Sequence, residues 1–276
     1  MKKFYLHIIL TIMLIASIDA FGQYSLDNSG KIENKGTIKV KSGQVKGLPD
    51  TLTGRIEFLQ HSFTSQQSIP NIVYEQLVLK NRAKKIVSDA YKNQDGTPRS
   101  LVTLDSLIIA DSGYFTTHWI GLNPNDIHAK ASVSNKASYT GPKYIKLSNE
   151  IVEQDLIGNG KFSKLEIDNP NGVNVIDGGF TVSNGLRLTR GELRNSIPNN
   201  LAIGDSALIE RQVGASIQAA PEFEGKTSIR YYGDGSLVTG NELPVDSTSI
   251  LAFSVEAVKG IVLNQDVTVL DSLYIG

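Results

Sequence analysis

Apolar and polar residues alternate along most of the chain in short runs, and the runs end at Gly, Asn, Asp, Ser or Pro. Residues 37–40, 55–58 and 101–104 are typical of these runs. Period-two alternation bounded by turn residues predicts short β-strands that bury one face. The best helix candidate, 82–92, carries only a partial apolar stripe, so we expect a loop there, or one or two helical turns. The pattern therefore predicts an all-β protein.

Some of these predicted strands recur as a group. The segment 161–193 is repeated, loosely but in register, at 251–276, and the separation of Gly172 from Gly260 gives a period of about 88 residues. Repetition of small β units is typical of proteins in which each unit completes its core against the next. The repeat therefore indicates an architecture of stacked units.

Two features favour a right-handed parallel β-helix, or β-solenoid, over tandem antiparallel β-sandwich modules. One is the internal repeat. The other is the modest size of the apolar residues, because only 7% of the chain is aromatic and it contains a single Trp. The pair Asn184-Gly185 favours the alternative, since Asn-Gly between alternating apolar residues is a hairpin signal. The sequence thus predicts a solenoid and leaves the sandwich open.

The N-terminus has the layout of a secretory signal peptide. Lys2 and Lys3 precede an apolar run at 4–18, and small residues lead to a cleavage site between Gly22 and Gln23. The apolar run is shorter than the ~20 residues that a membrane-spanning helix needs. We therefore expect an exported protein, extracellular or at the cell surface, whose mature chain has no transmembrane segment.

We expect the chain to comprise the signal peptide 1–22, a β-repeat region at 23–160 and a second β-repeat region at 161–276. The second copy of the repeat stops at Gly276, directly after the counterpart of Leu188. Repeat arrays need polar caps, because an uncapped end exposes unpaired strand edges. The sequence is therefore interpreted as a fragment of a longer array.

Composition excludes several classes of function. Removing the signal peptide takes away Lys2, Lys3 and Asp19, which changes the net charge from −1 to −2. This balance argues against nucleic-acid binding, which depends on clustered cations. The chain has no cysteine, which removes thiol catalysis, thiolate metal sites and disulfides. No cofactor is predicted.

Carboxylates are the most plentiful candidate catalytic groups. Glu150, Glu153 and Asp155 form the densest set, and a glycosidase needs two carboxyl groups placed across a sugar. Carboxylates spread through turns more often solvate a surface. The segment 168–172 imitates a calcium-binding loop but does not fit its ligand spacing, so it is interpreted as a turn.

Other candidate binding groups are scattered. They are two histidines, two aromatic residues that could stack on a sugar, and one basic cluster that could contact an anionic glycan: His118, His128, Trp119, Tyr232, Arg82, Lys84 and Lys85. Alternation predicts that one of Tyr231 and Tyr232 points inward and the other outward. None of these residues has the spacing of a known metal or nucleophile motif.

Several short signatures, taken in order, resemble the β-strand modules of large exported cell-surface proteins of Bacteroidota. They lie at 34–38 (N-x-G-T-I), at 54–77 (G-x-V-x-F … Q-x-I-P … Y-x-x-L), at 169–191 (N-x-x-G-V … L-x-L-x-x-G) and at 232–244. Together they cover about two-thirds of the mature chain. The resemblance implies surface architecture and type IX secretion, and it supplies no catalytic residues.

The resemblance also implies a form of modification. Five Asp-Ser/Thr sites resemble the acceptor motif for O-glycosylation in exported proteins of this group, with the acceptors Thr51, Ser106, Ser206, Ser247 and Ser272. Asp and Ser also form tight turns through hydrogen bonds from side chain to backbone, and a turn exposes its hydroxyl. Both readings therefore hold together.

We interpret the chain as a non-enzymatic structural or adhesive segment of an exported surface protein, an elongated β scaffold. Its expected partners are surface glycans, other surface proteins and the secretion machinery. The alternatives are a polysaccharide-active β-helix enzyme, for which the carboxylates above are the candidates, and a glycan-binding module centred on Trp119 or Tyr232.

Overall fold

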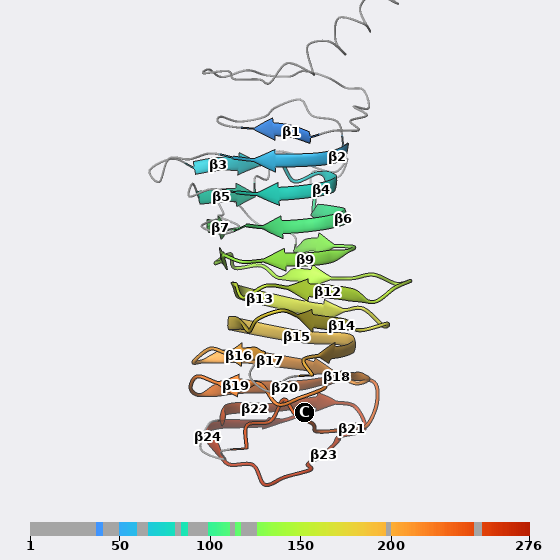
Figure 1. Ribbon diagram of the computed structural model, residues 1–276. Coiled ribbons are helices and arrows are strands. Elements are labelled where there is room, and N and C mark those ends of the chain that lie inside the picture. The colour runs from blue at the N-terminus through green and yellow to red at the C-terminus, as the bar shows by residue number, and fades with distance from the viewer. Residues whose placement is uncertain are drawn as a thin grey trace, which may run out of the picture.

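The structure is a computed structural model that describes residues 37–40, 50–59, 66–80, 84–87, 99–110, 114–116, 126–196, 200–245 and 250–276. These residues form strands and no helix, and the strands stack as coils of a β-solenoid with about 9 turns (Figure 1). The predicted all-β solenoid class is confirmed. Since the described part contains no helix, it also contains none long and apolar enough to cross a membrane.

The strands follow one another down the column in chain order. They are β1 (Thr37–Val40), β2 (Thr51–Phe58), β3 (Gln66–Ile69), β4 (Val73–Leu79), β5 (Lys84–Val87), β6 (Leu101–Ile109), β7 (Tyr114–Thr116), β8 (Ile127–Ala129), β9 (Ser132–Asn135), β10 (Ser138–Tyr139), β11 (Ile145–Leu147), β12 (Gln154–Ile157), β13 (Lys161–Asp168), β14 (Val173–Ile176), β15 (Phe180–Arg194), β16 (Leu201–Ile203), β17 (Ala207–Gln212), β18 (Ala215–Ile217), β19 (Glu222–Phe223), β20 (Thr227–Gly233), β21 (Leu237–Val238), β22 (Ile250–Ala257), β23 (Ile261–Val262) and β24 (Val269–Ile275).

Every strand pairing among the described residues is parallel. Parallel strands need a crossover connection, and in a solenoid the rest of the turn supplies it. Tandem antiparallel sandwich modules would contain antiparallel pairs. The alternative fold is therefore wrong.

Most of one turn of the solenoid lies within a single strand, β15. The first part of β15 pairs with β16, the segment Gly185–Leu188 pairs with β17, and the segment Gly191–Leu193 pairs with β18. The strand therefore bends round three faces of the column. Asn184 and Gly185 lie at the bend between the first two faces, where the register with β13 shifts, and they do not form a hairpin. The hairpin indicated by the sequence is wrong because a corner uses the same residues as a hairpin turn.

The predicted repeat corresponds to four turns. Five inward residues follow one another in register down one face: Leu165, Leu186, Ile209, Ile229 and Phe253. The separation of the first from the last is 88 residues, the period found in the sequence. The repeat was thus a multiple of the structural unit, which is one turn.

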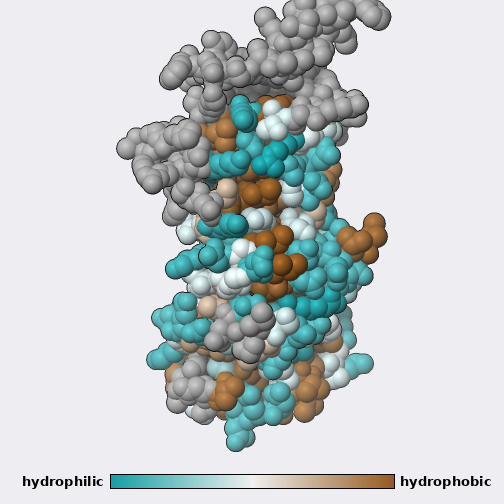
Figure 2. All heavy atoms as spheres, in the orientation of Figure 1, coloured by the Kyte–Doolittle hydropathy of each residue, from teal (hydrophilic) through white to brown (hydrophobic). Residues whose placement is uncertain are grey.

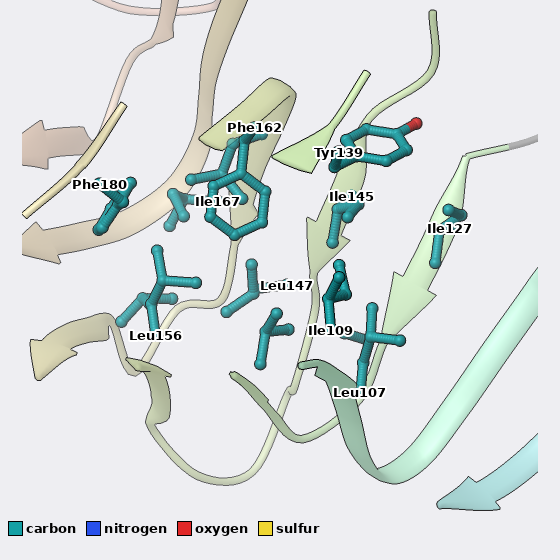
Figure 3. Packing of buried hydrophobic residues seen from close by; sticks show 14 of the residues in the cluster. Leu107, Ile109, Ile127, Tyr139, Ile145, Leu147, Leu156, Phe162, Ile167 and Phe180 are labelled. Carbon is teal, nitrogen blue, oxygen red and sulfur yellow. The ribbon is translucent and has the colours of Figure 1, made fainter. Parts of the chain in front are cut away.

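The interior is filled by alternate residues of each strand. The side chains labelled in Figure 3 come from β6 to β15 and gather in one continuous apolar cluster. Aromatic rings are part of it, since Phe162 and Phe180 pack edge to face with centroids 5.7 Å apart. A second, smaller cluster contains the inward residues from Ile229 to Val255. In the coloured part of Figure 2, hydrophilic residues are spread over the face shown, with apolar residues in smaller groups between them.

Asparagines tie successive corners together. The buried Asn169 donates through Nδ2 to the carbonyl of Val152, one turn earlier, and its Oδ1 accepts from the backbone N–H of Asn171. The buried Asn195 exchanges two hydrogen bonds with the backbone of Ala219, one turn later. Because a buried amide must satisfy its polar atoms, these contacts fix where each corner lies.

Two further sequence predictions concern the chain's organisation. The region 82–92, expected to be a loop or short helix, contains the strand β5 in its described part, because β5 pairs with β3 and β7. Strand pairing continues across the boundary expected between residues 160 and 161, because β13 pairs with β10 and β11 of the preceding turn. The signal peptide 1–22 lies outside the described residues.

Candidate functional site: a ladder of paired charges

Charged side chains from successive turns line up on one outer face of the solenoid. Five of them are register partners on successive strands, and the sixth lies on β22, two residues beyond Ser254, the register partner of Arg230. We call this set the charge ladder: Lys146, Glu166, Arg187, Glu210, Arg230 and Glu256. The sign of the charge alternates at every step. Because parallel stacking brings equivalent positions of adjacent turns within ~5 Å of each other, neighbouring signs decide the energy of the register.

The alternating charges are joined by ion pairs along the ladder. Glu166 accepts from Lys146 Nζ at 3.0 Å and lies 3.4 Å from Arg187 Nη1. Glu210 lies 2.8 Å from Arg187 Nη2 and 3.1 Å from Arg230 Nη1. Arg230 also binds Glu256 at 2.6 Å. Each inner charge therefore has a partner on both neighbouring turns.

The two central carboxylates are almost fully buried although they project from the outer surface. Glu166 and Glu210 are 4% and 5% exposed. A buried carboxylate is stable only when charge-assisted hydrogen bonds surround it. Burial lowers the pKa of Lys146, but its hydrogen bonds to Asp168 and Glu166 outweigh that effect and raise the pKa above its usual value. The ladder thus favours the charged form of Lys146.

Tyr144 covers the middle of the ladder. Its ring lies 4.2 Å from the guanidinium carbon of Arg187, and its hydroxyl donates to Glu210 Oε2 at 3.1 Å. Burial and the charge of Glu210 raise the pKa of the Tyr144 hydroxyl. The ring passes over Gly185, where a Cβ would lie 3.1 Å from the tyrosine oxygen. Gly185 therefore leaves room for Tyr144.

The carboxylates singled out in the sequence are also engaged in separate contacts. Glu150 accepts from Arg190 Nη1 at 2.9 Å, and Glu153 accepts from Arg194 Nη1 at 3.0 Å. Asp155 Oδ1 accepts from the side-chain amide of Asn174 at 3.2 Å. Both arginines belong to β15, whereas both glutamates lie in the connection between β11 and β12. The two ion pairs therefore stabilise this connection against a later turn.

The candidate glycosylation acceptors differ in their surroundings. Ser206 is exposed in a turn with φ +63°, and Ser272 is exposed on β24. Thr51 is half-buried at the start of β2. Ser106 lies within β6 rather than in a turn, and its Oγ is buried. Ser247 lies outside the described residues, as do the cleavage residues Gly22 and Gln23.

The remaining candidates do not form one site. Tyr231 is buried and Tyr232 is half-exposed, so the predicted alternation is confirmed. Lys85 is 1% exposed, and burial lowers its pKa to about 8. Lys85 is therefore not available to a surface patch of the basic cluster, and the side chain of Lys84 lies outside the described residues. His118, Trp119 and Arg82 lie outside the described residues.

The structure also describes His128 and the segment 168–172. His128 lies half-buried on β8, and burial together with the charge of Lys146 lowers its pKa. The segment 168–172 is a turn, as interpreted, in which Gly172 has φ +91°. Within the described residues, no three His, Cys, Asp or Glu side chains come together as a metal site would require.

Sequence reasoning missed the charge ladder. The signal was present, because Lys146, Glu166, Arg187, Glu210 and Arg230 alternate in sign at spacings of one turn. This alternation can be recognised only when the number of residues in one turn is known. The repeat found in the sequence has the length of four turns, so it did not give that number.

The fold and the site define a parallel β-solenoid with a self-paired outer face. Comparison with known protein families, with curated proteins and with solved structures found no match for this chain.

Proposed function

We propose that this chain is a non-enzymatic structural segment of an exported surface protein and acts as an elongated β scaffold. The charge ladder carries the proposal. Its charges bind one another from turn to turn, so they stabilise stacking along the axis rather than forming a set of groups directed at a ligand. A stack of turns that differ little from each other provides length and an outer surface on which loops are displayed.

The shifted carboxyl groups support a structural role over hydrolysis. A glycosidase needs a general acid whose pKa is raised above its usual value. The pKa is lowered in four carboxyl groups: Glu57, Glu150, Asp168 and Glu256. Hydrogen bonds and charges from Arg or Lys favour the ionised form of each group. In Glu57 and Asp168 they outweigh burial, which by itself raises the pKa. Groups of this kind hold ion pairs and do not donate protons near neutral pH.

Export and display at the cell surface complete the proposal. Their support is the signal-peptide pattern ending at Gly22 and the resemblance to secreted surface modules. The exposed Ser206 and Ser272 are the acceptors best placed for O-glycosylation, since their turns or edges leave them open to an enzyme. Surface glycans and other surface proteins are the proposed partners.

The proposal is tested by assaying the purified mature chain on a panel of plant, algal and bacterial polysaccharides. Reducing ends report hydrolysis, and ultraviolet absorbance of unsaturated products reports elimination. We expect no turnover. Turnover that falls on Glu150→Gln or Glu153→Gln substitution, and not on substitution of the ladder carboxylate Glu256→Gln, would establish the enzyme instead.

A further inference from the structure

The solenoid interior changes character between its two hydrophobic clusters. At the inward position of β17, where the preceding turn has Leu188, the chain places Arg211, and the next turn places Tyr231 there. Glu242, from the corner after β21, is fully buried and contacts both. We call Arg211, Tyr231 and Glu242 the polar layer. The larger cluster reaches Ile217 in the same turn as Arg211, and Tyr231 belongs to the smaller one.

The two carboxylate oxygens of Glu242 have unequal surroundings. Oε1 accepts from Arg211 Nη1, from the Tyr231 hydroxyl at 2.8 Å and from the backbone N–H of Gly240 at 2.9 Å. Oε2 is buried and accepts no hydrogen bond from the described residues. A buried, charged oxygen without a donor is costly, so a group that donates to Oε2 would stabilise the polar layer.

Gly240 lies next to this oxygen. A Cβ built on Gly240 would lie 3.0 Å from Glu242 Oε2 and 3.3 Å from Arg211 Nη1. Gly240 itself is half-exposed. The open side of the glycine therefore faces one hydrogen-bond acceptor and one donor at the same time.

The chemistry of this pair selects the ligand. A cation beside Gly240 would be repelled by the guanidinium of Arg211, and an anion would be repelled by Glu242. A small neutral molecule that both donates and accepts hydrogen bonds satisfies both groups. Water has this chemistry, and buried waters are typically held by two to four polar partners.

We propose that the polar layer binds one ordered water molecule beside Gly240. The water donates to Glu242 Oε2 and accepts from Arg211, which completes the hydrogen bonding of the carboxylate. The site belongs to the interior and does not depend on the function proposed for the outer surface.

A high-resolution crystal structure of the mature chain tests the proposal directly. We expect a peak at hydrogen-bond distance, about 2.7–3.2 Å, from both Glu242 Oε2 and Arg211. A peak with several oxygen ligands at about 2.3–2.6 Å would identify a cation instead. A direct bond between Oε2 and a protein donor, or no peak beside Gly240, would also overturn the proposal.

Two glycine variants test it in solution. Gly240→Ala places a methyl group against Glu242 Oε2 and Arg211 Nη1, whereas Gly235→Ala meets the side chain of Val213. Oxygen-17 relaxation dispersion counts long-lived internal waters. We expect Gly240→Ala to lose one such water and Gly235→Ala to keep the wild-type number. Equal numbers in the wild type and both variants would overturn the proposal, and if Gly240→Ala fails to fold, the wild-type crystal structure decides.

Discussion

At the scale of single residues, Gly185 shows how a neighbour rather than the local backbone can require a glycine. Gly185 follows Asn184 as in a hairpin turn, but its φ is not positive, and Tyr144 lies over it. The tyrosine starts two turns away and reaches Glu210 one turn beyond. A side chain at 185 would therefore obstruct a contact that spans several turns.

We expect Gly185→Val to lower the free energy of unfolding by about 1–3 kcal/mol, because the added side chain displaces Tyr144. The measurement is urea unfolding followed by circular dichroism. The matched control places the same substitution in a Tyr144→Ala background, where there is no ring to displace. We expect a smaller loss there, and an equal loss in both backgrounds would contradict the role assigned to Tyr144.

Asp168 links stability to pH. Burial raises its pKa, but hydrogen bonds and charges from Arg190 and Lys146 outweigh burial, and the pKa lies below its usual value. A group with a lowered folded pKa stabilises the protein above its unfolded pKa, near ~3.9 for Asp, and this contribution is lost as pH falls through the folded pKa.

We therefore expect Asp168→Asn to lower Tm at about pH 7 and to have a diminishing effect as pH falls to about 3 and below. Thermal unfolding of both proteins across this range is the measurement. A difference in Tm that stays constant with pH would show that the carboxylate charge is not responsible.

At the scale of elements, the sequence identified the strands because alternation and turn residues report local structure. It could not decide between corners and hairpins, since Asn184 and Gly185 suit both. It also could not give the length of a turn. Register partners are 18 residues apart at Ala129 and Leu147 but 29 apart at Tyr74 and Thr103, so the spacing is irregular in the N-terminal half.

The candidate site was less accessible to sequence reasoning than the fold. Glu150 and Glu153 were noticed because they are close in the chain, whereas Glu166 and Glu210 meet Arg187 only after the turns stack. The pairing of a ladder depends on which residues share a register, and register is a property of the folded sheet.

The charge ladder predicts an asymmetry between its centre and its end. Glu166→Lys puts a cation between Lys146 and Arg187 at a buried position, and we expect a loss on the order of 3–5 kcal/mol. Glu256→Lys makes the same change at the end of the ladder, where the side chain is 35% exposed, and should cost much less. Urea unfolding of the two variants is the measurement, and equal losses would contradict the importance of burial in the ladder.

At the scale of the whole molecule, one feature unites the fold and the proposed function. Each turn covers the core of the previous one. At the ladder position, a turn stacks favourably only on a turn whose ladder residue has the opposite charge. Turns are therefore removable in pairs but not singly. Deleting residues 167–210 removes two turns and leaves Glu166 between Lys146 and Arg230, whereas deleting 167–187 removes one turn and leaves Glu166 against Glu210.

The free energy of unfolding of these two deletion variants is the most direct test of the scaffold account. We predict that the two-turn deletion unfolds cooperatively and that small-angle scattering shows a molecule shorter by about 10 Å, two inter-strand spacings. We predict that the one-turn deletion is less stable although it removes less of the core. A one-turn deletion as stable as the two-turn deletion would contradict the account.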